Sequence, residues 1–214
     1  MPDQLFRDRI EAGRLLGAAV AERCGGREGN LVLALPRGGV PVALGVAEAL
    51  GAPLDVFVVR KLGVPGHEEW AMGAIASGGV RVMNQDVLDQ AGTGPEVIES
   101  VAAREQLVLE RRERLFRGQK PPLAISGHQV IVVDDGLATG SSMRAAVRAL
   151  RAMGPASITI AVPVGPRSTC LDLHAGGENV ICLRTPDPFE AVGRWYRDFE
   201  QTTDGEVREL LLLG

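Results

Sequence analysis

Val130-Ile-Val-Val-Asp-Asp-Gly-Leu-Ala-Thr-Gly-Ser-Ser-Met143 is the stretch that decides the fold. Its first four residues are all β-branched, which predicts a strand buried on both faces, as in a parallel sheet. Two aspartates follow this strand, and a glycine-containing segment then leads into an apolar-periodic helix. A glycine turn between a strand and a helix presents free backbone N–H groups and the positive end of a helix dipole to an anion.

Residues 138–142 have the composition of a phosphate cradle. Gly140 lets the backbone approach a phosphate closely, and the small hydroxyl residues around it add donors without bulk. Asp134 and Asp135 are negatively charged, so they suit neutral hydroxyl groups or a divalent cation instead of a phosphate. Together these residues predict a site for a ribose 5-phosphate. An ordinary strand–turn–helix with a solvated aspartate turn is the alternative.

A second strand–glycine turn–helix unit lies earlier in the chain. Residues 31–35 predict a short buried strand, and a helix follows that ends at Leu50 and is capped by Gly51. Between them Arg37 stands beside two glycines whose backbone N–H groups are exposed, which predicts a second anion site. Taken alone, this turn would also fit a tight turn with a surface arginine.

The remaining chain alternates between strands and helices, and its strands lack polar faces. This pattern predicts a three-layer α/β domain with a mainly parallel sheet, whose ligands lie outside the carboxyl ends of the strands. Residues 62–73, which contain glycine, proline and charged side chains, predict an irregular, mobile lid. The other expected helices are 3–24, 84–91, 95–117, 168–174 and one from 203; the other expected strands are 54–59, 74–76, 80–83, 157–162 and 179–183.

Composition narrows the class of protein. The 214 residues fit one domain, and 45% hydrophobic with 23% charged residues is typical of a soluble globular protein. A net charge of -4 argues against a general nucleic-acid binder. Three cysteines without a C-x-x-C pair fit a reducing compartment, and no apolar run is long enough for a membrane span. We expect a cytoplasmic protein without a membrane partner.

The stretch 130–143 resembles the phosphoribosyl-pyrophosphate (PRPP) signature of type I phosphoribosyltransferases: an apolar strand, two acidic residues and a Thr-Gly phosphate loop. A P-loop would require Gly-Lys-Ser/Thr, and a Rossmann fingerprint would require three glycines; neither occurs here. A receiver domain carries paired aspartates too, but near the start of its chain. The resemblance covers nearly the whole chain in order, with 36–41 as the pyrophosphate loop and 62–73 as the flexible loop.

This resemblance implies a fold and an activity. The fold is a single domain, residues 1–214, in which a small hood subdomain closes over the acceptor. We expect the hood in the segment after about residue 165, with parts of 1–25 and 84–122. The activity is that of a pentosyltransferase, in which a nitrogen acceptor, such as a nucleobase, displaces pyrophosphate from PRPP with the help of Mg²⁺. PRPP and a small-molecule acceptor are then the partners, and a homo-oligomer is left open.

The resemblance also implies residue roles. Asp134 and Asp135 would hold the ribose hydroxyls, directly or through metal-bound water. The leaving pyrophosphate would be neutralised by Arg37, the Gly38 and Gly39 amides and Lys61, with Arg60 nearby. The 5-phosphate would be bound by Ala138, Thr139, Gly140, Ser141 and Ser142.

Three questions stay open at the level of sequence. Hypoxanthine-guanine enzymes carry an aspartate where this chain has Ala138, which weakens a 6-oxopurine acceptor and leaves the acceptor unassigned. A PRPP- or nucleotide-sensing regulator on the same fold is the main alternative function, and a sugar-phosphate enzyme is a further one. Finally, the aromatic and basic residues 194–196 would either stack on a ligand ring or pack within the hood.

Overall fold

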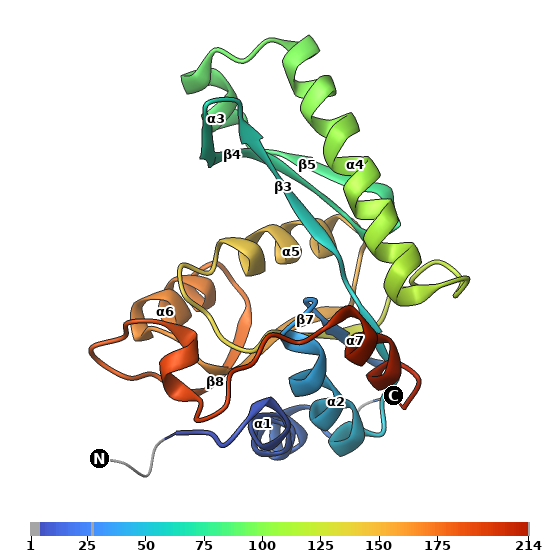
Figure 1. Cartoon of the computed structure of the whole chain (residues 1–214), viewed down its shortest axis with the longest axis vertical. Helices are drawn as coiled ribbons and strands as arrows, with labels where there is room; N and C mark the ends of the chain where they lie inside the picture. Colours follow the sequence, from blue (N-terminus) through green and yellow to red (C-terminus); the bar gives the residue numbers. More distant parts are fainter. Residues whose placement is uncertain (1–4, 27, 214) are drawn as a thin grey trace.

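The computed structural model describes residues 5–26 and 28–213 and is built on a five-stranded parallel sheet (Figure 1). The strand order is β2-β1-β6-β7-β8. Ala34 pairs with Val133, and Val133 pairs with Ala161, so β1 and β6 end at the same level and β7 continues to Val164. The strands are β1 (Asn30–Ala34), β2 (Leu54–Val56), β6 (Gln129–Val133), β7 (Ser157–Val164) and β8 (Asn179–Arg184).

Helices cover both faces of this sheet, which confirms the predicted three-layer architecture. Val130 and Val132 of β6 pack in one hydrophobic cluster with α5 (Ser141–Ala152) and α6 (Arg167–Ala175). Ile131 and Val133 pack in a second cluster with α1 (Arg9–Cys24) and α2 (Gly39–Leu50). Figure 1 shows these two pairs of helices on opposite sides of the sheet. The β-branched run of β6 is buried on both faces because each side supplies an apolar layer.

A second, antiparallel sheet stands apart from the first, and Figure 1 shows it projecting together with the long helix α4. Its strands, in the order β3-β4-β5, are β3 (Val59–Val64), β4 (His67–Ala76) and β5 (Val80–Met83). The β4–β5 hairpin confirms the one expected over 74–83. The helices α3 (Gln85–Ala91) and α4 (Pro95–Arg117) follow it, as predicted.

Two expectations about residues 54–73 are wrong. The expected strand over 54–59 is two strands in different sheets, since β2 ends at Val56 and β3 begins at Val59. The expected irregular lid over 62–73 is the β3–β4 hairpin, with Val64 paired to His67. Leu62 and Val64 are both buried, so the hairpin has an apolar face. The glycines and the proline around them favour a loop and interrupt this pattern in the sequence.

The start of the chain lies against its tail. α1 begins at Arg9, where the Asp8 side chain caps it by accepting a hydrogen bond from the Glu11 N–H at 2.8 Å. Residues 5–8, which the prediction of a helix over 3–24 includes, are therefore not helical. Residues 3 and 4 lie outside the described residues. The Phe6 N–H donates to the Trp195 carbonyl at 2.9 Å, and the Phe6 carbonyl accepts from Arg197.

The tail after β8 contains a short 3-10 turn, Val192–Trp195, and the helix α7 (Asp204–Leu210). Thr203 and Glu206 form the predicted capping box at the start of α7. The tail is the segment in which we expect the hood, and that assignment stays a prediction. Among the described helices, none combines the length and the apolar character that crossing a membrane requires.

Candidate active site

Residues 36–39 of the predicted pyrophosphate loop 36–41, called the pyrophosphate turn below, lie directly against the two aspartates that follow β6. A Cβ atom added to Gly38 would lie 2.1 Å from Asp135 Oδ2, and one added to Gly39 would lie 2.7 Å from the Val133 carbonyl oxygen. No side chain fits in these gaps, which explains why both positions are glycine. The structure thus brings together two pairs of residues that stand nearly 100 positions apart in the sequence and that are both expected at the PRPP site.

Asp134 and Asp135 form a largely enclosed acidic pair, with the Asp135 side chain 16% exposed. The Asp135 N–H donates to Asp134 Oδ1 at 2.9 Å. Burial, and after it the negative charge of Asp135, raises the pKa of Asp134 well above its usual range. Burial also raises the pKa of Asp135, although the neighbouring Arg9 guanidinium opposes the shift. The pair therefore resists carrying two negative charges unless a ligand supplies positive charge or hydrogen-bond donors.

Arg9 clamps Asp135 from the other side, a role that the sequence analysis missed. Its Nε and Nη2 atoms both lie 2.8 Å from Asp135 Oδ2, and its side chain is only 11% exposed. Its Nη1 atom donates to the Glu200 carbonyl at 2.6 Å, and the guanidinium carbon lies 3.9 Å from the centre of the Phe199 ring. Arg9 therefore joins α1, the acidic pair and the tail.

Tyr196 completes the surroundings of Asp135. Its hydroxyl donates to the Asp135 carbonyl at 2.6 Å, and burial of the ring raises the pKa of Tyr196 strongly. Its neighbour Arg194 forms an exposed ion pair with Glu190 at 3.0 Å. Tyr196 is thus buried against the acidic pair. This agrees with the alternative in which residues 194–196 pack inside the protein and do not stack on a ligand ring.

The predicted phosphate cradle, residues 138–142, forms the start of α5. Gly140 adopts a left-handed conformation (φ 72°) at the N-cap and offers no side chain to cap the helix, and the Ser141 N–H makes a long hydrogen bond of 3.4 Å to Thr139 Oγ1. The Thr169 hydroxyl of α6 donates to the Ala138 carbonyl at 3.1 Å and so fixes the loop from behind. The N–H groups of Ser142 and Met143 and the helix dipole are then available to an anion.

The three basic residues of the prediction lie in three different places. Lys61 Nζ donates to the Ser141 hydroxyl at 3.3 Å, so it lies at the cradle and not at the pyrophosphate turn. Arg60 points to the opposite face of β3 and donates to Glu105 of α4 at 2.6 and 2.8 Å, because neighbouring residues of a strand alternate between faces. The structure does not bring Arg60 to the cradle or to the turn, and its assigned role stays a prediction.

Arg37 remains at the pyrophosphate turn, where the sequence analysis placed it. Its side chain is 36% exposed, and its Nη1 atom lies 3.5 Å from Asp204 Oδ1 at the start of α7. A surface ion pair of this length contributes little stability. The guanidinium can therefore exchange Asp204 for an anionic ligand at low cost.

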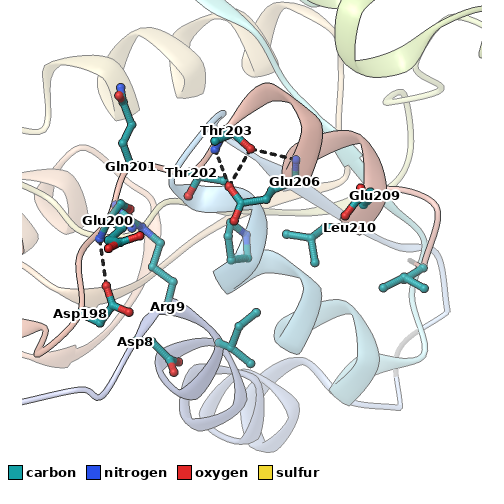
Figure 2. Close-up of a pocket in the computed structure, with 13 residues that line it drawn as sticks. Asp8, Arg9, Asp198, Glu200, Gln201, Thr202, Thr203, Glu206, Glu209 and Leu210 are labelled. Carbon is teal, nitrogen blue, oxygen red and sulfur yellow. Dashed lines mark hydrogen bonds between the residues drawn. The ribbon is translucent and has the colours of Figure 1, made fainter.

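A pocket of 430 Å³ lies between the start of α1, Pro41 of α2 and the tail that leads into α7 (Figure 2). Figure 2 shows Arg9 reaching from α1 toward Glu200 of the tail, with the Thr203–Glu206 capping box on the far side of the pocket. The charged residues that line it are mostly acidic: Asp8, Arg9, Asp198, Glu200, Glu206 and Glu209. This charge does not suit a phosphate, so the pocket does not compete with the turn and the cradle, where the anion sites are predicted.

Comparison with known proteins identifies the family. A sequence model of the phosphoribosyl transferase domain matches residues 7–192. The chain belongs to the phosphoribosyl transferase family. The matched segment contains the pyrophosphate turn, the acidic pair and the cradle, and the described fold is the type I phosphoribosyltransferase fold: a parallel five-stranded sheet between helices, with a small antiparallel sheet.

Two relatives and one solved structure extend this result. A Mycobacterium tuberculosis H37Rv protein, whose name assigns it provisionally as a phosphoribosyl transferase, is 44% identical over 204 residues, which are 95% of this chain and 46% of that protein. The chain thus spans about half the length of this curated relative. A crystal structure of a Thermus thermophilus protein is 42% identical, covers 98% of both chains and superposes with a TM-score of 0.88. The bifunctional protein PyrR of Actinobacillus pleuropneumoniae (strain L20) is 33% identical over 85 residues, 38% of this chain and 48% of PyrR.

Proposed function

We propose that the chain transfers the ribose-5-phosphate group of PRPP to a nitrogen acceptor and releases pyrophosphate. The observation that supports this most directly is the contact between Gly38 and Asp135, where a Cβ atom would leave only 2.1 Å. It brings a predicted pyrophosphate site against a predicted ribose site, and the cradle begins three residues after Asp135. PRPP carries these three groups in the same order: pyrophosphate, ribose and 5-phosphate.

The proposed reaction needs little covalent help from the protein. Displacement at C1 through a dissociative, oxocarbenium-like transition state needs charge stabilisation at the leaving group, a fixed ribose and the exclusion of water. Arg37 and the backbone N–H groups of Gly38 and Gly39 would stabilise the leaving pyrophosphate. Asp134 and Asp135 would orient the ribose hydroxyls, and residues 138–142 would hold the 5-phosphate.

The acidic pair also fits a Mg²⁺ ion that arrives with PRPP. Within residues 5–26 and 28–213, no three His, Cys, Asp or Glu side chains cluster into a metal site. Mg²⁺ is commonly held by one or two carboxylates together with substrate phosphates and water, which matches two adjacent aspartates beside a phosphate site. When bound, the ion would neutralise negative charge on the pyrophosphate. Asp134 and Asp135 would hold it through water or through the ribose hydroxyls.

The position of Lys61 changes one proposed role. Its ammonium group lies 3.3 Å from the Ser141 hydroxyl, at the end of the site that would hold the 5-phosphate. We therefore assign Lys61 to the 5-phosphate in this conformation, and Arg37 to the leaving pyrophosphate. Lys61 belongs to the β3–β4 hairpin, so it would also tie this hairpin to the bound substrate.

A regulator that binds PRPP without turning it over is the second candidate, and one observation favours it. Asp135 Oδ2 already accepts from Arg9 at 2.8 Å, which leaves the carboxylate less free to accept from ribose hydroxyls than in an open site. The partial likeness to PyrR concerns 38% of the chain and agrees with a regulatory use of the same fold. In this candidate the site would bind PRPP but would not assemble for transfer.

Pyrophosphate release separates the two candidates. The wild type would be incubated with PRPP, Mg²⁺ and a panel of purine and pyrimidine bases, with Arg37→Gln as the site variant and Arg208→Gln as the control. Arg208 is an exposed arginine of α7 outside the site. A transferase releases pyrophosphate with at least one acceptor, loses that activity in Arg37→Gln and keeps it in Arg208→Gln. PRPP binding without release for any acceptor would support the regulator.

A further inference from the structure

A basic groove of 200 Å³ lies between α5 and the small antiparallel sheet. Three cationic side chains line it, Lys61, Arg144 and Arg148, against a single carboxylate, that of Glu69. Its wall on the sheet side is made largely of small residues, Ala71, Gly73 and Ala74, which leave space in front of the cations. Positive charge, concavity and small wall residues together suit an anion of modest size.

Arg144 and Arg148 present the basic face of α5 to this groove. They are four residues apart, so their side chains lie on the same face of the helix. Arg144 Nη2 lies 3.6 Å from Asp172 Oδ2, a long contact between two side chains that are 45% and 67% exposed. In the described part of the chain, Arg148 has no hydrogen bond or ion pair. Both guanidinium groups therefore have donors to offer a ligand.

The groove begins at Ser141 of the cradle and runs along α5, so a bound 5-phosphate would occupy only one end of it. Ser141 is the first residue of α5 and Arg148 is the eighth. At 1.5 Å per residue, the two positions are about 10 Å apart along the helix axis. A phosphate held by the first-turn N–H groups would thus lie at one end of the groove, and the backbone of Arg148 lies toward the other end. The bound 5-phosphate would leave the outer part of the groove positively charged.

We propose that this groove is a second anion site, which binds the phosphoryl group of a ligand other than the ribose 5-phosphate. Arg144 and Arg148 would contact it from α5, while Lys61 stays with the 5-phosphate at the Ser141 end of the groove. A phosphoryl group matches the site because guanidinium groups bind phosphate oxygens with paired hydrogen bonds. This site stands apart from the proposed transfer reaction, since it needs neither the acidic pair nor the pyrophosphate turn.

Phosphate binding in the presence of PRPP tests the proposal. Equilibrium dialysis with radiolabelled inorganic phosphate would be run at low ionic strength, with and without saturating PRPP and Mg²⁺. We expect one phosphate per chain that PRPP does not displace. Arg148→Gln should weaken this binding about tenfold or more, since it removes a charge-assisted contact. Arg208→Gln, the exposed arginine of α7, should leave it unchanged.

Two results would overturn the proposal: PRPP displaces all of the phosphate, or Arg148→Gln binds it as tightly as Arg208→Gln. In a second arm a nucleoside monophosphate replaces phosphate; tighter binding assigns the site to a nucleotide, and binding that is no tighter assigns it to free phosphate. If PRPP does not bind but phosphate binding depends on Arg148, the proposed transfer reaction is wrong and the second anion site is supported. If PRPP binds but no Arg148-dependent phosphate binding is found, the second anion site is wrong and the PRPP site is supported.

Discussion

Gly38→Ala tests the contact on which the proposed site depends. The added Cβ atom would lie 2.1 Å from Oδ2 and 2.7 Å from Cγ of Asp135, whereas ordinary contacts begin at 3.4 Å. The turn or the carboxylate must therefore move by about 1.3 Å. Arg9 holds the same oxygen through two contacts of 2.8 Å, so the carboxylate cannot move without breaking them. Overpacking of this kind costs about 1 to 3 kcal/mol of unfolding free energy.

Chemical denaturation and calorimetric titration of PRPP with Mg²⁺ would measure the two consequences. We expect Gly38→Ala to lose about 1 to 3 kcal/mol of stability and to bind PRPP at least about tenfold more weakly. Gly94→Ala is the matched control, because that glycine has a negative φ of -70° and an added Cβ would meet nothing within 4 Å. The control should keep PRPP affinity and lose under about 1 kcal/mol. A Gly38→Ala protein with wild-type stability and PRPP affinity would refute the reasoning.

Three further variants test the surroundings of the site. Arg9→Met leaves Asp135 buried without its cation, so we expect denaturation to show a loss of about 3 to 5 kcal/mol; unchanged stability would contradict the clamp. Burial raises the pKa of Asp134 in the folded state, so wild-type stability should fall as pH rises above about 4. Asp134→Asn removes the titrating carboxyl, so it should unfold at a higher temperature than the wild type at pH ~8, and this difference in unfolding temperature should vanish near pH ~4. An equal difference at both pH values would show that titration of Asp134 does not cause it. Lys61→Met should weaken ribose-5-phosphate and PRPP in calorimetry by similar factors, because both carry the 5-phosphate; a loss confined to PRPP would return Lys61 to the pyrophosphate.

Local patterns predicted the layers of the fold well. The run of β-branched residues in β6 encodes burial on both faces, because such side chains fit between two apolar layers. The glycine turns at 36–39 and 138–142 each follow a strand, and parallel strands place their carboxyl ends at one edge. These features depend on neighbours within a few residues, so the sequence alone carries them. The family resemblance supplied the assignment of roles, which no local pattern contains.

The parts that were missed depend on contacts between distant residues. Arg9 and Asp135 are 126 positions apart, and an arginine at the start of an amphipathic helix is otherwise an ordinary surface residue. Arg60 and Lys61 are adjacent, and only the placement of β3 between α4 and α5 shows that they serve different neighbours. The β3–β4 hairpin was missed because glycine and proline at its turn favour a loop, and because burial along β4 changes from an exposed half to a buried half and does not alternate.

Titration of PRPP in the presence of Mg²⁺ is the most direct test of the central claim. The account predicts a binding event in the micromolar range that requires Mg²⁺, that is weakened by Asp135→Asn, and that ribose-5-phosphate reproduces only at higher concentration. If ribose-5-phosphate binds as tightly as PRPP, the cradle is supported as a phosphate site, but the pyrophosphate site is contradicted. The absence of binding by either ligand would contradict the assignment of the whole site.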